Sequence, residues 1–84
     1  METIPYPDQM FRWTLRQTMD RYGVTRYALQ KEADIAMNTV RAMYDGKPTR
    51  IDFPVVERVI HALRRLTKQP LTAADVFTWE EGEK

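Results

Sequence analysis

The residues between 37 and 44 include side-chain types that suit contact with nucleic-acid bases. Asn can pair bidentately with adenine, Arg can do the same with guanine, and Met or Ala can touch the methyl group of thymine. If the segment is helical, such side chains share an arc of about 140°, occupied by Met37, Asn38, Arg41 and Ala42. The opposite arc is apolar and contains Ala36, Val40, Met43 and Tyr44. This pattern predicts a helix that packs through one face and presents the other outward.

The sequence contains few residues suited to catalysis, metal binding or cofactor binding. The chain has no Cys and a single His, His61, so a thiolate zinc site, a cysteine nucleophile and a two-histidine metal site are all excluded. The carboxylates of Asp20, Glu32 and Asp34 suit helix-surface or turn positions, and no nucleophile accompanies them. The three glycines are too far apart to form a phosphate-cradling loop. We therefore expect no enzymatic activity, no metal and no cofactor.

Length and charge narrow the class of protein. A chain of 84 residues is expected to form a single domain, residues 1–84, that buries roughly 60% of its unfolded surface. No apolar run could span a membrane and the first residues lack the plan of a signal peptide, so we expect a cytoplasmic protein without a membrane partner. The net charge is only +1, yet residues 12–50 contain eight basic and four acidic residues. The positive charge is therefore concentrated in the segment that contains this outward face.

The sequence predicts two helices before that face. Residues 1–7 contain two prolines and no apolar period, which indicates an extended N-terminal arm ending at Asp8, a candidate N-cap. A first helix follows and ends at Gly23; its apolar stripe comprises Phe11, Leu15, Met19 and Tyr22. Thr25 caps a short second helix that runs to about residue 33. Asp34 then occupies a sharp turn, because Asp tolerates positive φ.

Two further helices are predicted after Gly46, the residue that ends the helix of residues 37–44. Asp52 caps a long fourth helix whose apolar side chains share an arc of about 140°, namely Val55, Val56, Val59, Ile60, Leu63 and Leu66. Thr72 caps a short fifth helix that ends near Trp79, and residues 80–84 form a mostly acidic, flexible tail. No segment has the alternating, β-branched pattern of a strand. The predicted fold class is all-α, with five helices.

The segment from Thr25 to Gly46 resembles the DNA-binding domains of the Cro and lambda-repressor type, without insertion or deletion. The resemblance rests on the residues that lock the two helices of the helix-turn-helix together and close the second one: Leu29, Ile35, Val40, Met43, Asp45 and Gly46. The predicted fourth and fifth helices are also similar to the family's bundle, so the resemblance covers roughly residues 11–78. It implies a five-helix lambda-repressor-like bundle that contains a helix-turn-helix.

Three residues depart from the family pattern. Asp34 stands in the turn where the family usually has Gly, and Gln30 stands where it has a small residue. A long side chain at position 30 is expected to widen the helix packing unless it points aside. Ala36 replaces the hydroxyl-bearing cap common at the start of the recognition helix, which costs that helix about 1 kcal/mol.

The resemblance also implies which side chains meet DNA. Bases in the major groove would be read by Met37, Asn38, Arg41 and Ala42. Phosphates would be contacted by Arg26, Thr39, Lys47 and Arg50, with Arg26 in the first turn of the second helix, where anions are favoured. The simpler alternative for each of these residues is a solvated side chain on a helix surface or loop.

Three aromatic residues near the chain ends remain to be placed. Trp13 lies opposite the apolar stripe of the predicted first helix, about 200° from Phe11. Either the N-terminal arm or the fifth helix covers Trp13, or Trp13 belongs to a dimer or partner surface, since exposed aromatics are typical of interface centres. Phe77 and Trp79 raise the same alternatives.

Together these features predict a sequence-specific, double-stranded DNA-binding transcriptional regulator of bacterial or phage origin. A repressor acting as a homodimer on a palindromic operator is the simplest form, with the helix of residues 37–44 in the major groove. The main alternative is a protein-interaction module, such as an antitoxin-like partner or an adaptor, that uses Trp13, Phe77 and Trp79. Single-stranded RNA binding through Tyr22, Tyr27 and Tyr44 is less favoured, because helical periodicity places Tyr22 and Tyr44 inward.

Overall fold

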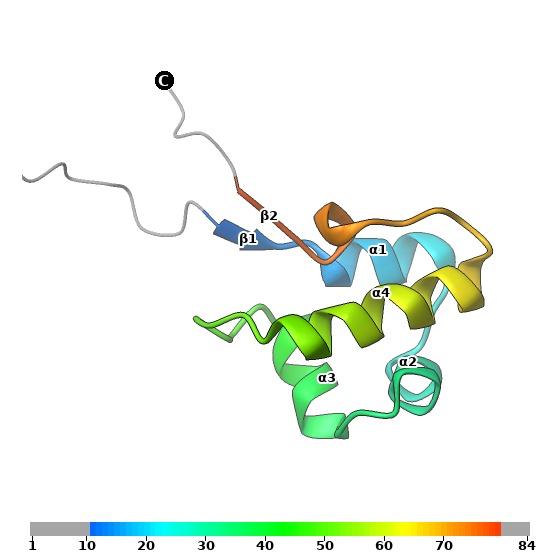
Figure 1. Ribbon diagram of the computed structural model, residues 1–84, viewed down its shortest axis with the longest axis horizontal. Coiled ribbons are helices and arrows are strands. Elements are labelled where there is room, and N and C mark those ends of the chain that lie inside the picture. Colours follow the sequence, from blue (N-terminus) through cyan, green and yellow to red (C-terminus); the bar gives the residue numbers. More distant parts are fainter. Residues whose placement is uncertain (1–10, 80–84) are drawn as a thin grey trace, which may run out of the picture.

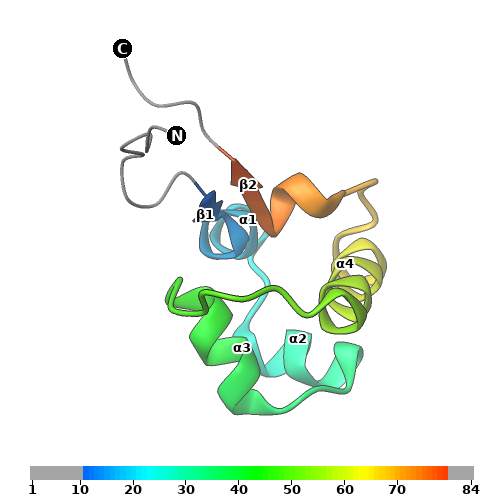
Figure 2. The same cartoon turned by 60° about the vertical axis from the view of Figure 1, so that its left-hand side comes forward.

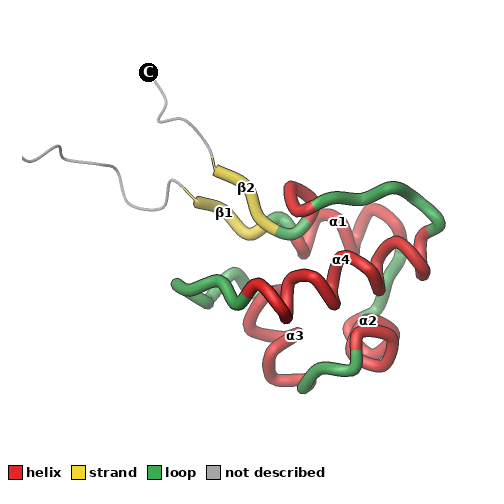
Figure 3. Tube along the Cα trace, viewed as in Figure 1, coloured by secondary structure: helices red, strands yellow, loops and turns green. Residues whose placement is uncertain are grey.

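A computed structural model of the chain describes residues 11–79. Within them lie four α-helices (Figure 1): α1 Leu15–Tyr22, α2 Arg26–Ala33, α3 Met37–Tyr44 and α4 Phe53–Thr67. A single 3-10 turn, η1 Ala73–Asp75, and two short strands, β1 Phe11–Trp13 and β2 Phe77–Trp79, complete the described part (Figure 3). The prediction of a mainly helical protein is confirmed. The predicted arm, its cap at Asp8 and the acidic tail lie outside the described residues.

The predicted local signals set most of the helix ends. Thr25 accepts a hydrogen bond from the backbone N–H of Ala28 at 3.0 Å, and Asp52 accepts one from Val55 at 3.4 Å, so both residues act as N-caps. Gly23 ends α1 in the left-handed conformation with φ 69°, where a residue without Cβ is favoured. These helix boundaries thus follow largely from neighbouring residues.

The core forms where the apolar faces of the four helices meet. Its largest fully buried side chains come from every helix and from the residue after η1: Leu15, Met19, Leu29, Val40, Val59, Leu63 and Val76. α2 packs against α4 and α3, while α1 packs against α3 (Figure 2). On α4, the predicted polar side is exposed, including His61, but Leu66 is 37% exposed and Ala62 is buried instead. The apolar stripe of α4 is therefore slightly rotated from the predicted one.

The predicted start of the first helix is wrong, because residues 11–13 form a strand. β1 pairs antiparallel with β2, with Phe11 opposite Trp79 and Trp13 opposite Phe77. The backbone N–H of Thr14 donates to the carbonyl of Val76 at 2.8 Å, which ties the start of α1 to the end of the chain. A three-residue strand has no readable period, and its partner lies more than sixty residues away. We call the pair β1 and β2 the β-ribbon.

The predicted fifth helix is also corrected: it ends after one 3-10 turn. Its cap forms as expected, since Thr72 and Asp75 make a reciprocal capping box. The carbonyls of Ala74 and Asp75, which would accept backbone bonds in a longer helix, instead accept the hydroxyls of Thr14 and Thr18, both at 2.7 Å. The backbone after Asp75 is therefore free to turn into β2.

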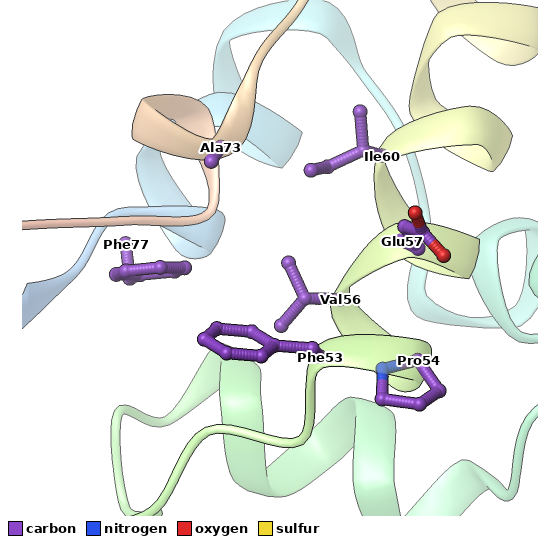
Figure 4. Close-up of a pocket in the computed structure, with 7 residues that line it drawn as sticks. All are labelled: Phe53, Pro54, Val56, Glu57, Ile60, Ala73 and Phe77. Carbon is purple, nitrogen blue, oxygen red and sulfur yellow. The ribbon is translucent and has the colours of Figure 1, made fainter.

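An apolar groove of about 350 Å³ lies between the first turns of α4 and the segment from η1 to β2. Figure 4 shows Phe53 and Val56 on one side of the groove and Phe77 on the other. Phe53 is 72% exposed at its mouth. Among residues 11–79, no helix is both long and apolar enough to cross a membrane.

Candidate DNA-binding surface

The turn between α2 and α3 is closed by side chains from two helices. Asp34 adopts the left-handed conformation, φ 57°, as the sequence predicted for a non-glycine residue at this turn. The side-chain amide of Gln30 donates to the carbonyl of Ile35 at 3.0 Å, and the guanidinium of Arg58 donates to the carbonyl of Asp34 at 3.1 Å. Gln30 therefore points aside into the turn and fastens it, while Leu29 stays fully buried between the helices.

The two faces of α3 are largely as predicted. Val40 and Met43 are buried, whereas Asn38 and Arg41 are exposed. Ala36 begins the helix without a side-chain cap, as its residue type requires. Two of the predicted base-contacting residues, Met37 and Ala42, are only half-buried rather than fully outward, and Met37 packs against the core. Asn38 and Arg41 are thus the polar side chains that α3 offers to a partner.

The loop after α3 is held in a defined shape. Gly46 has φ 72°, and the N–H groups of Gly46 and Lys47 donate to the carbonyls of Met43 and Ala42, which is a Schellman motif. The indole N–H of Trp13 donates to the carbonyl of Pro48 at 2.9 Å. The strand β1, through Trp13, therefore anchors the loop that carries Lys47 and Arg50.

The predicted phosphate-contacting residues lie around α3 but not all at the surface. Arg26 is the first residue of α2 and is exposed, and Lys47 and Arg50 are exposed in the loop. Thr39 is half-buried. These cations and Arg41 belong to the segment 12–50, whose formal charge is positive, so the surface suits a polyanion.

Sequence reasoning missed Arg16 on α1. Its guanidinium carbon lies 5.3 Å from the centroid of the Tyr44 ring, and that of Arg26 lies 5.0 Å from the same centroid. The Tyr44 hydroxyl donates to Asp20 at 2.9 Å. These four residues come from three different helices, so their spacing along the chain does not indicate that they are in contact.

The three terminal aromatics lie on the β-ribbon. Trp13 is half-buried and meets the edge of Phe77, with 6.1 Å between ring centroids, so the C-terminal segment covers it, although as a strand rather than a helix. Phe77 is itself half-buried, and Trp79 is 49% exposed. Phe11, opposite Trp79 in the ribbon and 59% exposed, was missed because it was assigned to the apolar stripe of α1.

Comparison with known families decides the classification. The model of the Cro/C1-type HTH DNA-binding domain matches residues 14–65, which is more than half of the chain. The chain belongs to this Cro/C1-type helix-turn-helix family. It is accordingly a DNA-binding protein of a transcription-regulating type. The match begins after β1 and ends before η1, so the β-ribbon lies outside the part shared with the Cro/C1-type model. Neither the curated proteins nor the solved structures give a significant match to the chain.

Proposed function

We propose that this Cro/C1-type protein is a sequence-specific repressor that inserts α3 into the major groove. The observation that carries the proposal is the pair Asn38 and Arg41, exposed on a helix whose other face is fixed by the buried Val40 and Met43. Asn38 suits an adenine edge and Arg41 a guanine edge. Met37 and Ala42 would supply apolar contact at the margin of the same face.

Backbone contacts are proposed on both sides of α3. Arg26 lies at the start of α2, where unpaired backbone N–H groups favour an anion, and Lys47 and Arg50 lie in the anchored loop. Thr39, half-buried on α3, would contact a phosphate through its hydroxyl. Repression would follow from occupancy of the operator, with polymerase or a competing protein excluded.

Selection of bound sites from a random double-stranded library tests the proposal. We expect enrichment of a defined motif, and Asn38→Ala should change the preference at one base position by about 1 to 3 kcal/mol. Gln69→Ala, which removes an exposed amide from the loop after α4, is the matched control and should select the parental motif. Recovery of the same motif with equal affinity by Asn38→Ala would show that Asn38 does not read a base, and the same result with Arg41→Ala as well would show that this face of α3 does not read the DNA.

We further propose that two copies associate through the β-ribbon to bind a palindromic operator. The proposal is supported by the exposed Phe11 and Trp79, which lie opposite each other outside the family-matched part. Trp79→Ser should weaken self-association in sedimentation experiments and reduce affinity for a two-half-site operator more than for a single half-site. Unchanged self-association would contradict dimerisation through the β-ribbon and favour the alternative, in which this surface binds a different protein.

A further inference from the structure

Two arginines from different helices converge on one aromatic ring beside the helix-turn-helix. Arg16 of α1 and Arg26 of α2 both stack on Tyr44, the last residue of α3, at 5.3 and 5.0 Å from the ring centroid. Their guanidinium carbons can be no farther apart than the sum of these two distances. The half-buried Tyr44 is in turn fixed by its hydroxyl, which donates to Asp20 at 2.9 Å.

The cluster has an excess of positive charge, because two arginines and a single carboxylate, that of Asp20, meet at Tyr44. Among the described residues, neither Arg16 nor Arg26 forms an ion pair with a carboxylate, whereas Arg65 is paired with Glu32. Holding two like charges close together is unfavourable, and the attraction of each cation to the ring only partly offsets it. A phosphate whose oxygens reach both guanidinium groups would offset this positive charge and gain charge-assisted hydrogen bonds.

The position of the cluster favours one anion in particular. Arg26 is the first residue of α2, so backbone N–H groups without a partner inside the helix lie next to its side chain. Tyr44 closes α3, the helix proposed to enter the major groove. An anion held here would lie beside that groove, where the DNA backbone runs.

We propose that Arg16 and Arg26, stacked on Tyr44, form a composite clamp for a phosphodiester of the double-stranded DNA backbone. The proposal rests on the DNA-binding function above and adds α1 to the contact surface. Tyr44 is a positioning residue: it orders both guanidinium groups and links the phosphate contact to the end of the recognition helix. Arg16 and Arg26 would touch the phosphate oxygens directly, since Arg donors match phosphate geometry.

The test uses the full chain and a duplex selected by the parental protein. Arg16→Gln should weaken binding to all duplexes alike and lower the slope of log affinity against log salt by about 0.9. Arg21→Gln is the matched control, because Arg21 is an α1 arginine stacked on a different ring, Tyr22, at 5.4 Å, and lies about 140° around the helix from Arg16. Arg21→Gln should leave the slope within the error of the parent.

Duplexes carrying one neutral methylphosphonate at each backbone position in turn locate the contact. The parental protein should lose several-fold in affinity at one position or two adjacent positions, and Arg16→Gln, which keeps the Arg26 contact, should lose markedly less affinity at that same place. Tyr44→Leu should show the same reduced loss, and Tyr44→Phe, which keeps the ring, should show the parental loss. Circular dichroism of each variant checks that the helices are retained, and the arginine variants decide the matter if Tyr44→Leu unfolds.

The outcomes separate this proposal from the proposed function. If the parent binds its selected duplex but Arg16→Gln keeps both the parental salt slope and the parental methylphosphonate profile, the clamp is wrong and base reading by α3 stands. Equal slope losses in Arg16→Gln and Arg21→Gln also overturn the clamp, because they reflect net charge alone. If the parent binds no duplex, both proposals fall.

Discussion

The helix-turn-helix is stabilised by contacts between residues close in the sequence, and the β-ribbon by contacts between residues far apart in the sequence. In the helix-turn-helix, Thr25 caps α2 through a residue three positions away, and Gln30 fastens the turn through a residue five positions away. In the ribbon region, the hydroxyls of Thr14 and Thr18 bond to carbonyls 60 and 57 positions away. The helix-turn-helix is therefore shaped largely by its own residues, while the ribbon exists only when both ends of the described chain meet on α1.

This difference makes the two regions separable in experiments. Both tryptophans of the chain, Trp13 and Trp79, lie in the ribbon, so tryptophan fluorescence reports on that region. Far-ultraviolet circular dichroism reports mainly on the four helices. The two signals should coincide when the shared core is disturbed and diverge when only the ribbon is disturbed.

The largest effect is expected from the shared core. Leu29→Ala removes a fully buried side chain from the packing between the helices and should destabilise the protein by about 2 to 5 kcal/mol. Both signals should shift together in urea, because the ribbon cannot pair without the helices beneath it. Separate midpoints for the two signals would show that the ribbon is a more independent unit than we describe.

A smaller, more local effect is expected at the junction of α1 and η1. Thr18 is buried and its hydroxyl donates a hydrogen bond to the carbonyl of Asp75. Thr18→Val should remove this bond and lower the free energy of unfolding by about 1 to 2 kcal/mol. The fluorescence midpoint in urea should fall more than the dichroism midpoint. Thr14→Val is the control at a half-buried position with the same type of bond, and a larger effect there would contradict the account.

The bond between Trp13 and Pro48 joins the two regions. Trp13→Phe keeps most of the aromatic packing but removes the indole donor, so about 1 kcal/mol of stability should be lost. Because the loop bearing Lys47 and Arg50 loses its anchor, affinity for all duplexes should fall modestly and without change of sequence preference. Trp79→Phe, at an exposed site without that bond, should show neither effect in the monomeric protein.

The smallest expected effect is a gain within the helix-turn-helix. Asp34→Gly should stabilise the protein by about 0.5 to 1 kcal/mol, because glycine adopts φ 57° without strain from a Cβ atom. Thermal unfolding measures the gain. A loss of stability would mean that the Asp34 side chain contributes more to the turn than its backbone conformation indicates.

The same contrast explains which features were predictable from the sequence. Thr25, Asp34 and Gly46 act through their immediate neighbours, so residue type and spacing were enough to place the caps, the turn and the two faces of α3. Gln30 was recognised as unusual, but its bond across the turn depends on a side-chain direction that the pattern does not contain.

The features that sequence could not provide are all non-local. Phe11 fitted a helical stripe as well as it fits β1, and only pairing with Trp79 distinguishes the two. The carbonyls at the end of η1 accept hydroxyls of α1, which are distant in the sequence. The stacking of Arg16 and Arg26 on Tyr44 likewise requires three helices to be packed before the residues become neighbours.

The most direct test of the central claim is a base-pair scan of the selected duplex with the parental protein and Arg41→Ala. Arg41 is an exposed cation on α3, and we propose that it reads a guanine. The parent should lose about 1 to 3 kcal/mol when that G·C pair is replaced, and Arg41→Ala should be indifferent to the same replacement while keeping its preferences elsewhere. An Arg41→Ala profile that parallels the parental one at every position would contradict recognition of DNA by this face of α3.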